Sequence, residues 1–200
     1  MTAEILRTTG EHLLIVAVSV IAAIVIGIPI GIWCTRSRAA SRIALRLIDA
    51  IQTIPSLALF GFLIPVPLIG GIGMRTAIVA LILYSLLPIV RNTFLGIRGV
   101  DPLVREAGEA LGMTRRQLLR QIELPLAAPS IVAGIRIATT VAIGLATIAA
   151  AIGGGGLGTF IFRGVAMVDT KLILAGALPA AVLALVADGV FTMIEKALVR

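Results

Sequence analysis

Three ionisable residues lie inside stretches that are otherwise apolar: Asp49, Arg136 and Asp188. A charge near the centre of a bilayer is costly, so such groups usually pair with one another or extend towards the membrane surface. We expect either that Arg136 pairs with Asp49 or Asp188 and fixes the helix packing, or that the three groups extend to the surface separately. A proton relay is the weaker interpretation, because no series of histidine or glutamate residues accompanies them.

The chain lacks the residue sets that carry out catalysis. It contains one histidine, His12, and one cysteine, Cys34. A single cysteine excludes a disulfide within the chain and a multi-cysteine metal site. No Ser/His/Asp arrangement, HExxH motif or Walker-type phosphate loop is recognisable. We therefore expect a chain that is not an enzyme and has no catalytic residue, metal site or cofactor of its own. We expect His12 at the membrane interface.

A polar segment, residues 101–125, separates two apolar stretches and carries the signals of an ordered surface structure. Asp101 can cap a first helix that has Pro102 at its first position. Gly112 can end that helix in the left-handed conformation. Order of this kind between membrane spans indicates a surface that a partner binds.

A second short helix is expected to follow. Thr114 and Gln117 have the spacing of a capping box. We expect this helix to end near Leu124, because Pro125 lacks an N–H and restricts the residue before it.

The composition indicates a polytopic membrane protein. The chain has 200 residues, 59% hydrophobic and 14% charged, and its mean hydropathy is +1.12. We expect one all-α domain over residues 1–200, with about five membrane-spanning helices. The candidate spans are residues 13–33, 43–64, 76–90, 126–152 and 172–198. The net charge of +7 is explained by arginines beside the spans, so we do not expect nucleic-acid binding.

The positions of the arginines predict the orientation of the bundle. The loop after the first span contains Arg36, Arg38, Arg42 and Arg46, whereas Arg7 alone precedes that span. Because positive charge stays inside, the amino terminus is expected outside and the carboxyl terminus inside. The polar segment 101–125 then lies in the cytoplasm.

Small residues and prolines indicate how the spans pack. A small residue recurs at every fourth position of the fourth span: Gly134, Ala138, Ala142, Ala146 and Ala150. Such a stripe allows close helix approach, either within the bundle or against a second subunit. Gly27 and Gly31 form a weaker pair of the same kind. Pro55, Pro88 and Pro179 are expected to be kinks, with their freed carbonyl groups bonded by neighbouring helices.

A glycine-rich run follows the fourth span on the external side: Gly153, Gly154, Gly155, Gly156 and Gly158. Glycine permits unusual dihedral angles and close backbone approach. The run is either a flexible surface loop or a tight re-entrant turn beside the translocation path. In the second case, residues 159–168 form a short interfacial helix.

The polar segment resembles the cytoplasmic loop of the permease subunits of bacterial ATP-binding-cassette importers. That loop reads E-A-A, three residues, G, nine residues, I-x-L-P. The matching positions here are Glu106, Ala107, Gly108, Glu109, Ala110, Leu111, Gly112, Ile122, Leu124 and Pro125. The one departure is Gly108, where the pattern has alanine. The cost to the first helix is about 1 kcal/mol.

The whole chain resembles the osmoprotectant branch of these permeases, which import glycine betaine, choline, carnitine or related quaternary amines. The similar stretches are residues 47–59, 83–93, 134–138, 152–158, 162–164 and 169–170. Permeases for methionine share the number of spans and the glycine run, so methionine or another small solute is the alternative. An alternative of another class is a passive channel or a membrane scaffold.

The resemblance implies the partners. Two permease subunits, identical or paired with a sister chain, form the pathway in the bacterial inner membrane. Two ATPase subunits bind ATP and Mg²⁺ and dock on residues 101–111, and an external binding protein delivers the solute. Quaternary amines are held in aromatic cages, and aromatic residues are only 4% of this chain. Selectivity is therefore expected to reside in the binding protein.

Overall fold

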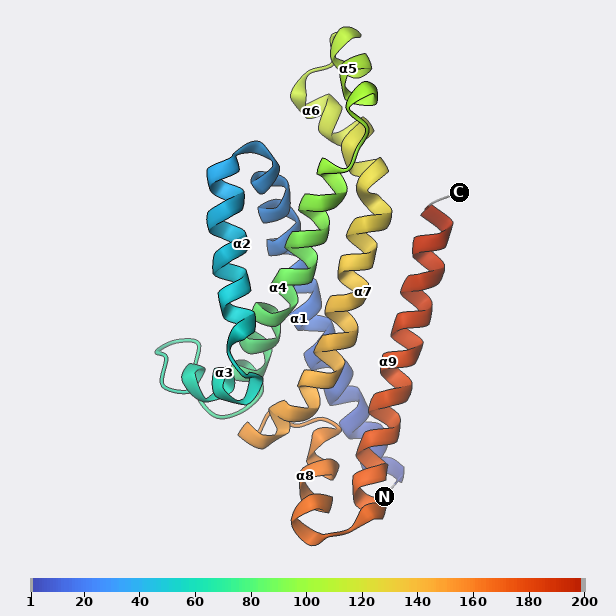
Figure 1. Ribbon diagram of the computed structural model, residues 1–200. Coiled ribbons are helices and arrows are strands. Elements are labelled where there is room, and N and C mark those ends of the chain that lie inside the picture. Colours follow the sequence, from blue (N-terminus) through green and yellow to red (C-terminus); the bar gives the residue numbers. More distant parts are fainter. Residues whose placement is uncertain (1, 199–200) are drawn as a thin grey trace.

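The computed structural model describes residues 2–198, and in that part of the chain every regular element is a helix. The elements are α1 (Thr2–Arg36), α2 (Arg38–Thr53), α3 (Ser56–Leu63), α4 (Met74–Arg98), α5 (Pro102–Ala110), α6 (Arg115–Leu118), the π-helical turn η1 (Leu119–Glu123), α7 (Leu124–Ala149), the 3₁₀ turn η2 (Ala150–Ile152), α8 (Gly158–Met167) and α9 (Thr170–Leu198). The long helices form one bundle with the chain ends at opposite ends of it (Figure 1). The end of α9 lies towards α5 and α6, as the expected orientation requires.

Four helices are long and apolar enough to cross a membrane: Ala3–Arg36, Met74–Arg98, Arg115–Ile152 and Thr170–Leu198. Each is longer than the span expected from the sequence. The span expected over residues 76–90 stops before Arg91, whereas α4 continues past that residue to Arg98.

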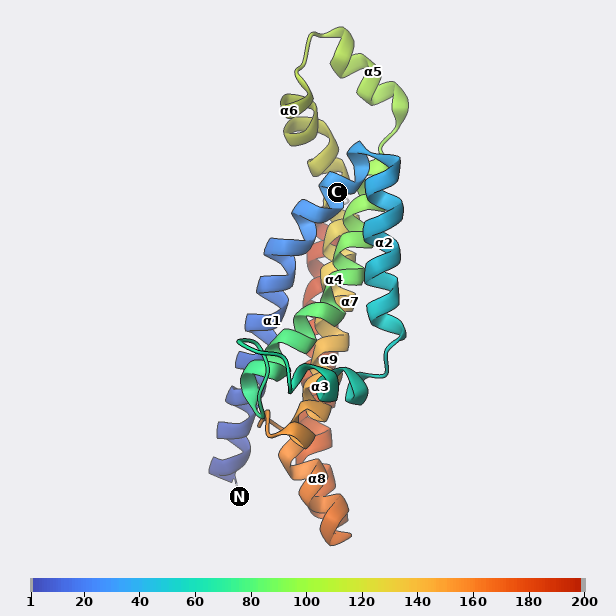
Figure 2. The same cartoon turned by 90° about the vertical axis from the view of Figure 1, so that its left-hand side faces the viewer.

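The span expected over residues 43–64 is broken in the middle, and the kink expected at Pro55 is present. Helices Ser41–Thr53 and Ser56–Leu63 are bent by 101° at their junction, so the fold has five crossings only if this pair is counted as one. The break occurs at Pro55, which cannot donate a backbone hydrogen bond and disfavours the helical conformation for Ile54. As a result α2 runs along the bundle, while α3 turns across its external end (Figure 2).

Helices α1, α4 and α7 form the centre of the bundle, and glycines set their spacing. A Cβ atom on Gly31 of α1 would lie 2.6 Å from the Thr93 Cβ of α4. A Cβ atom on Gly134 of α7 would lie 2.7 Å from the Pro88 carbonyl oxygen, also of α4. These distances are too short for any side chain, so glycine at both positions allows the backbones to meet.

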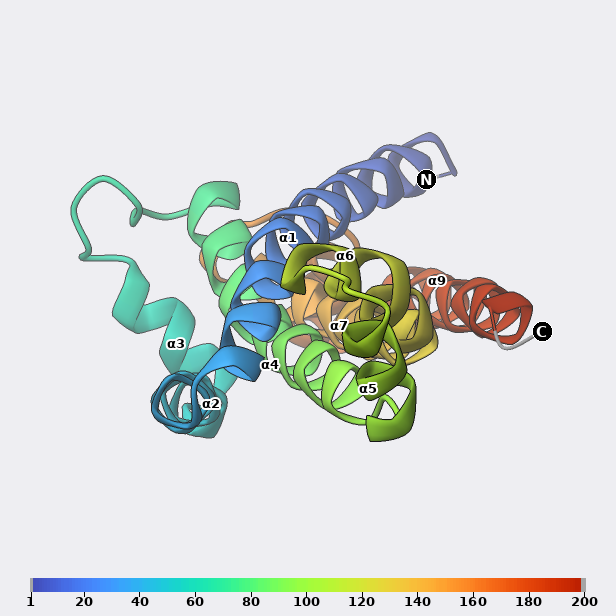
Figure 3. The same ribbon diagram turned by 90° about the horizontal axis from the view of Figure 1, so that it is seen from above.

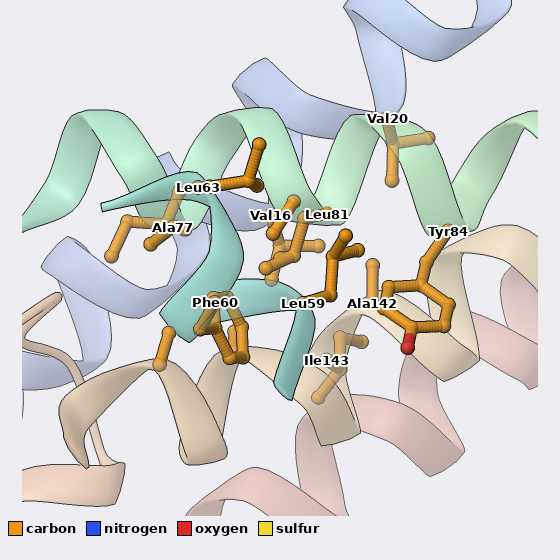
Figure 4. Close-up of a cluster of buried hydrophobic side chains, with 14 residues drawn as sticks. Val16, Val20, Leu59, Phe60, Leu63, Ala77, Leu81, Tyr84, Ala142 and Ile143 are labelled. Atoms are coloured by element: carbon orange, nitrogen blue, oxygen red, sulfur yellow. The ribbon is translucent and has the colours of Figure 1, made fainter. Parts of the chain in front are cut away.

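The stripe of small residues on α7 packs inside the subunit. Ala138, Ala142 and Ala146 are buried against α4 and α1, which decides between the two alternatives left by the sequence. At the external end, α3 inserts Phe60 into this core beside Ile143 of α7 (Figure 4).

The carbonyl group that Pro88 frees has a partner on a neighbouring helix, as expected. Proline at position 88 leaves the carbonyl oxygen of Tyr84 without its helical donor. The Gln52 Nε2 atom of α2 donates to this oxygen at 2.6 Å. The Tyr84 hydroxyl in turn donates to the Ile54 carbonyl oxygen at the break between α2 and α3. Tyr84 of α4 therefore makes hydrogen bonds both to α2 and to the break between α2 and α3.

Replacing Tyr84 by phenylalanine is expected to destabilise the protein by about 1–3 kcal/mol, because the Ile54 carbonyl group then loses its donor in a poorly hydrated position. Scanning fluorimetry of the purified protein in detergent measures the change. The matched control is Thr53→Val, which also removes one hydroxyl group, here one that donates only to Ala50 within the exposed part of its own helix. Equal melting temperatures for the two variants would contradict a structural role of Tyr84.

Candidate coupling segment and intramembrane ion pairs

The caps expected for the polar segment are confirmed. The Asp101 carboxylate accepts a hydrogen bond from the Leu103 N–H at 2.9 Å, with Pro102 in the first turn of α5. Gly112 has φ +78°. The Met113 N–H donates to the Gly108 carbonyl and the Gly112 N–H to that of Glu109, which is the Schellman pattern. Both ends of α5 are therefore fixed by local bonds.

The capping box at Thr114 is also present. The Gln117 N–H donates to Thr114 Oγ1 at 3.3 Å, and the Thr114 N–H donates to Gln117 Oε1 at 2.8 Å. The expected end near Leu124 is wrong, because α6 continues through η1 into α7 as one helix. The Leu124 N–H bonds the Leu119 carbonyl five residues earlier. This π-helical turn is wider than an α-helical one and leaves room for the ring of Pro125.

Arg105 fastens α5 to the membrane part of the protein. Its Nε atom lies 3.1 Å from Glu123 Oε1 of η1, and its guanidinium group also donates to the Ile97 carbonyl at the end of α4. Both side chains of the ion pair are mostly buried. Leu118 is buried beside Gly108. These contacts hold α5 in one orientation beyond the end of the bundle (Figure 2).

The motif residues divide into an outer and an inner set. Exposed on the outer surface are Glu106, Ala107, Glu109, Ala110, Leu111 and Gly112. Gly108 is buried, and a Cβ atom there would lie 2.8 Å from Leu118 Cδ1 and 2.9 Å from Ile122 Cδ1. The side-chain ends of Leu118 and Ile122 therefore fill the space in which the family pattern has an alanine methyl group. Apolar Leu103 and Leu111 are 71% and 84% exposed, so the outer surface is suited to a protein partner.

The intramembrane charges form two separate groups, one of three residues and one of two. Arg136 of α7 lies 3.8 Å from Asp188 Oδ1 and 3.6 Å from Glu195 Oε2, both on α9. Its Nη1 atom also donates to Thr192 Oγ1 at 3.0 Å. Asp49 does not pair with Arg136; its two carboxylate oxygens lie 3.0 and 3.2 Å from Arg91 Nη2. The charges thus tie α7 to α9 and α2 to α4.

Two of these partners, Glu195 and Arg91, were not predicted, although features of the sequence point to both. Glu195 follows Asp188 by seven residues, which places both on one face of a helix. Arg91 directly follows the span expected over residues 76–90, whereas α4 continues to Arg98 and so carries Arg91 within it.

Arg136→Ala is expected to destabilise the protein by about 1–3 kcal/mol, less than a fully buried pair would lose, because the group is partly exposed. The reason is that Asp188 and Glu195 remain as unpaired charges. Adding Asp188→Asn and Glu195→Gln should restore part of the loss in melting temperature. The control is Lys196→Ala, which removes an exposed cation at the same end of α9. A triple variant no more stable than Arg136→Ala would count against the pairing.

The glycine-rich run is a tight turn packed against α1. Gly153, Gly155 and Gly156 have φ between +73° and +80°, where side chains are strained. Gly154, Gly156 and Gly158 are buried. The expected short helix is present as α8, which packs against α9 (Figure 1). Proximity of the turn to a translocation path stays a prediction.

His12 lies inside the bundle and not at the membrane interface as expected. The side chain is fully buried, and its Nε2 atom lies 3.1 Å from the Ile143 carbonyl oxygen of α7. Since a carbonyl oxygen only accepts, Nε2 carries the hydrogen. A Cβ atom on Gly156 would lie 3.0 Å from His12 Nδ1. His12 therefore packs directly under the glycine turn.

Comparison with known proteins identifies the family. Residues 27–200 match the model of the binding-protein-dependent transport system inner membrane component. The chain is 45% identical over 195 residues to the choline transport system permease protein OpuBB of Bacillus subtilis (strain 168), covering 98% of this chain and 88% of that protein. It is 46% identical over 182 residues to the osmoprotectant import permease protein OsmW of Salmonella typhimurium (strain LT2), covering 90% and 85%.

The fold is also that of a solved transporter. The structure of the MetNI methionine ABC transporter in inward-facing conformations superposes with a TM-score of 0.91 at 24% identity, covering 100% of this chain and 98% of that one. The helical fold thus agrees with the family match. The chain belongs to the family of inner-membrane components of binding-protein-dependent transport systems.

Proposed function

We propose that the chain forms the translocation pathway of an ATP-driven importer together with a second permease subunit, and that α5 docks on a separate ATPase. The observation that carries this function is the outer surface of α5. It is held beyond the membrane by two caps and the Arg105–Glu123 ion pair, and it exposes Leu103 and Leu111. A scaffold or passive channel needs no such rigid, apolar projection.

The ATPase and the binding protein have separate roles. The ATPase binds ATP and Mg²⁺ and hydrolyses the nucleotide. An external binding protein delivers the solute to the end of the bundle where the glycine turn and α8 lie. Closure of the ATPase subunits moves α5, and with it the helices that surround the pathway, in a rigid-body transition.

The solute that we propose is a quaternary amine of the osmoprotectant class. The support is the sequence similarity to permeases named for choline and osmoprotectant transport; the methionine transporter supports the fold alone. Two of the few aromatic residues, Phe60 and Tyr84, are buried in the core. Trp33 and Phe62 are exposed on α1 and α3. We infer that an aromatic cage for the quaternary ammonium group belongs to the binding protein.

Uptake into proteoliposomes that contain the permease with its ATPase and binding protein tests this function. We expect uptake of labelled glycine betaine, choline or carnitine that depends on both ATP and the binding protein. If methionine is taken up and the three quaternary amines are not, methionine is the solute and the proposed class is wrong. If uptake does not depend on ATP, the chain forms a passive channel and not an ATP-driven importer.

A further inference from the structure

A cleft of about 240 Å³ opens between α2, α4 and α7. Figure 3 shows α2 on one side of α4 and most of α1 on the other. The lining of the cleft includes Gln52, Arg91 and Asn92 as polar residues and Ile137 and Val141 as apolar ones. At roughly 30 Å³ per water molecule, the space equals about eight waters, which is enough for a small solute.

The charged end of the cleft is not closed off by protein. The Arg91 side chain is 49% exposed, and that of Asp49, which it contacts, is 41% exposed. Arg91 lies seven residues before the end of α4 at Arg98, which is about 10 Å along the helix axis. Within a membrane, charged side chains as exposed as these must face a water-filled cavity or another protein surface, because acyl chains cannot solvate them.

We propose that this cleft receives the transported solute within the membrane, and that Asp49 and Arg91 contact its charged groups. This inference rests on the proposed function. A zwitterionic betaine carries the same two charges as the ion pair. Its ammonium group fits beside Asp49 and its carboxylate beside Arg91, while its methyl groups contact Ile137 and Val141. Both protein charges then stay compensated, which avoids the large cost of an unpaired charge.

The same chemistry predicts selectivity within the class. Choline has no carboxylate, so its cation competes with Arg91 for Asp49 and leaves the guanidinium group without a partner. The cleft therefore binds glycine betaine or carnitine more tightly than choline.

Thiol labelling tests whether the cleft holds water. Cys34 is the chain's only cysteine, so Cys34→Ala gives a background for single cysteines. Val141→Cys lies in the cleft, and Val25→Cys on α1 is the matched control; these valines are 42% and 67% exposed. The reagent is a water-soluble methanethiosulfonate with a trimethylammonium group, added to the assembled transporter. It should label the cysteine at position 141 about ten-fold faster than the cysteine at position 25, because only a hydrated thiolate reacts. Equal rates would overturn the inference.

Protection by solute tests binding. Glycine betaine should at least halve the labelling rate at position 141, and choline at the same concentration should protect less. Arg91→Gln should abolish the protection by glycine betaine, whereas Arg91→Lys, which keeps the charge, should retain it. Protection that is absent, equal for both solutes or unchanged in Arg91→Gln would overturn the proposal. ATP-driven uptake is measured in the same preparation. Normal uptake without protection means that the cleft proposal fails while the proposed function stands.

Discussion

Gly112→Val is expected to reduce ATP-driven uptake by about ten-fold or more while the protein still inserts in the membrane. The residue at this position has φ +78°, and a β-branched side chain in the left-handed region is strained by about 1–3 kcal/mol. The two Schellman bonds from Gly112 and Met113 that close α5 are then lost. The outer surface from Glu106 to Leu111 no longer has a fixed orientation towards the ATPase.

The control for this experiment is Gly112→Asn. Asparagine tolerates the left-handed conformation, and no other atom lies within 4 Å of a Cβ placed here. This variant should keep most of the uptake. Membrane abundance by immunoblot and ATP hydrolysis stimulated by loaded binding protein complete the comparison. Normal uptake by the valine variant would refute the role of a rigid α5.

Gly158→Ala is expected to have the largest effect on folding. A Cβ atom at this position would lie 1.9 Å from the Thr147 carbonyl oxygen and 2.7 Å from its carbonyl carbon. Both are backbone atoms of α7, so no side-chain rotation relieves the clash. We expect a loss of more than about 4 kcal/mol, the range of severe core substitutions, and little protein in the membrane.

Gly144→Ala is the matched control for Gly158→Ala. Gly144 lies in α7 and has no atom within 4 Å of its Cβ position. Alanine there should leave stability unchanged or raise it by up to about 1 kcal/mol through helix propensity. Membrane abundance and melting temperature distinguish the two variants. A Gly158→Ala protein that accumulates and melts like the parent would contradict the close approach of α8 to α7.

The features that could be predicted from the sequence are those that depend on neighbours within a few residues. The caps at Asp101, Gly112 and Thr114 are local hydrogen-bond patterns, and they are present as expected. The rule that a helix ends before proline failed at Pro125, because a π-helical turn can precede the ring. No rule based on residue type alone indicates where such a turn forms.

Features that depend on helix rotation and tertiary packing could not be predicted. The sequence offered Arg136 two acidic partners, and only the rotation of α2 about its axis turns Asp49 towards Arg91 instead. His12 is buried because α1 packs against α7. Its bonding partner Ile143 is 131 residues away in the sequence. The kink at Pro55 was expected from the proline, but the hydrogen bond from the Tyr84 hydroxyl to the Ile54 carbonyl oxygen beside it depends on tertiary packing.

The helix Arg115–Ile152 is continuous over 38 residues, which corresponds to a rod about 57 Å long. One end of this rod carries the capping box next to α5, and the other leads into the glycine turn over His12. Helical turns connect its two ends without a loop. A displacement at the cytoplasmic end therefore reaches the external turn as a tilt or shift of a single body, and mechanical signalling between the two sides requires no relay through loops.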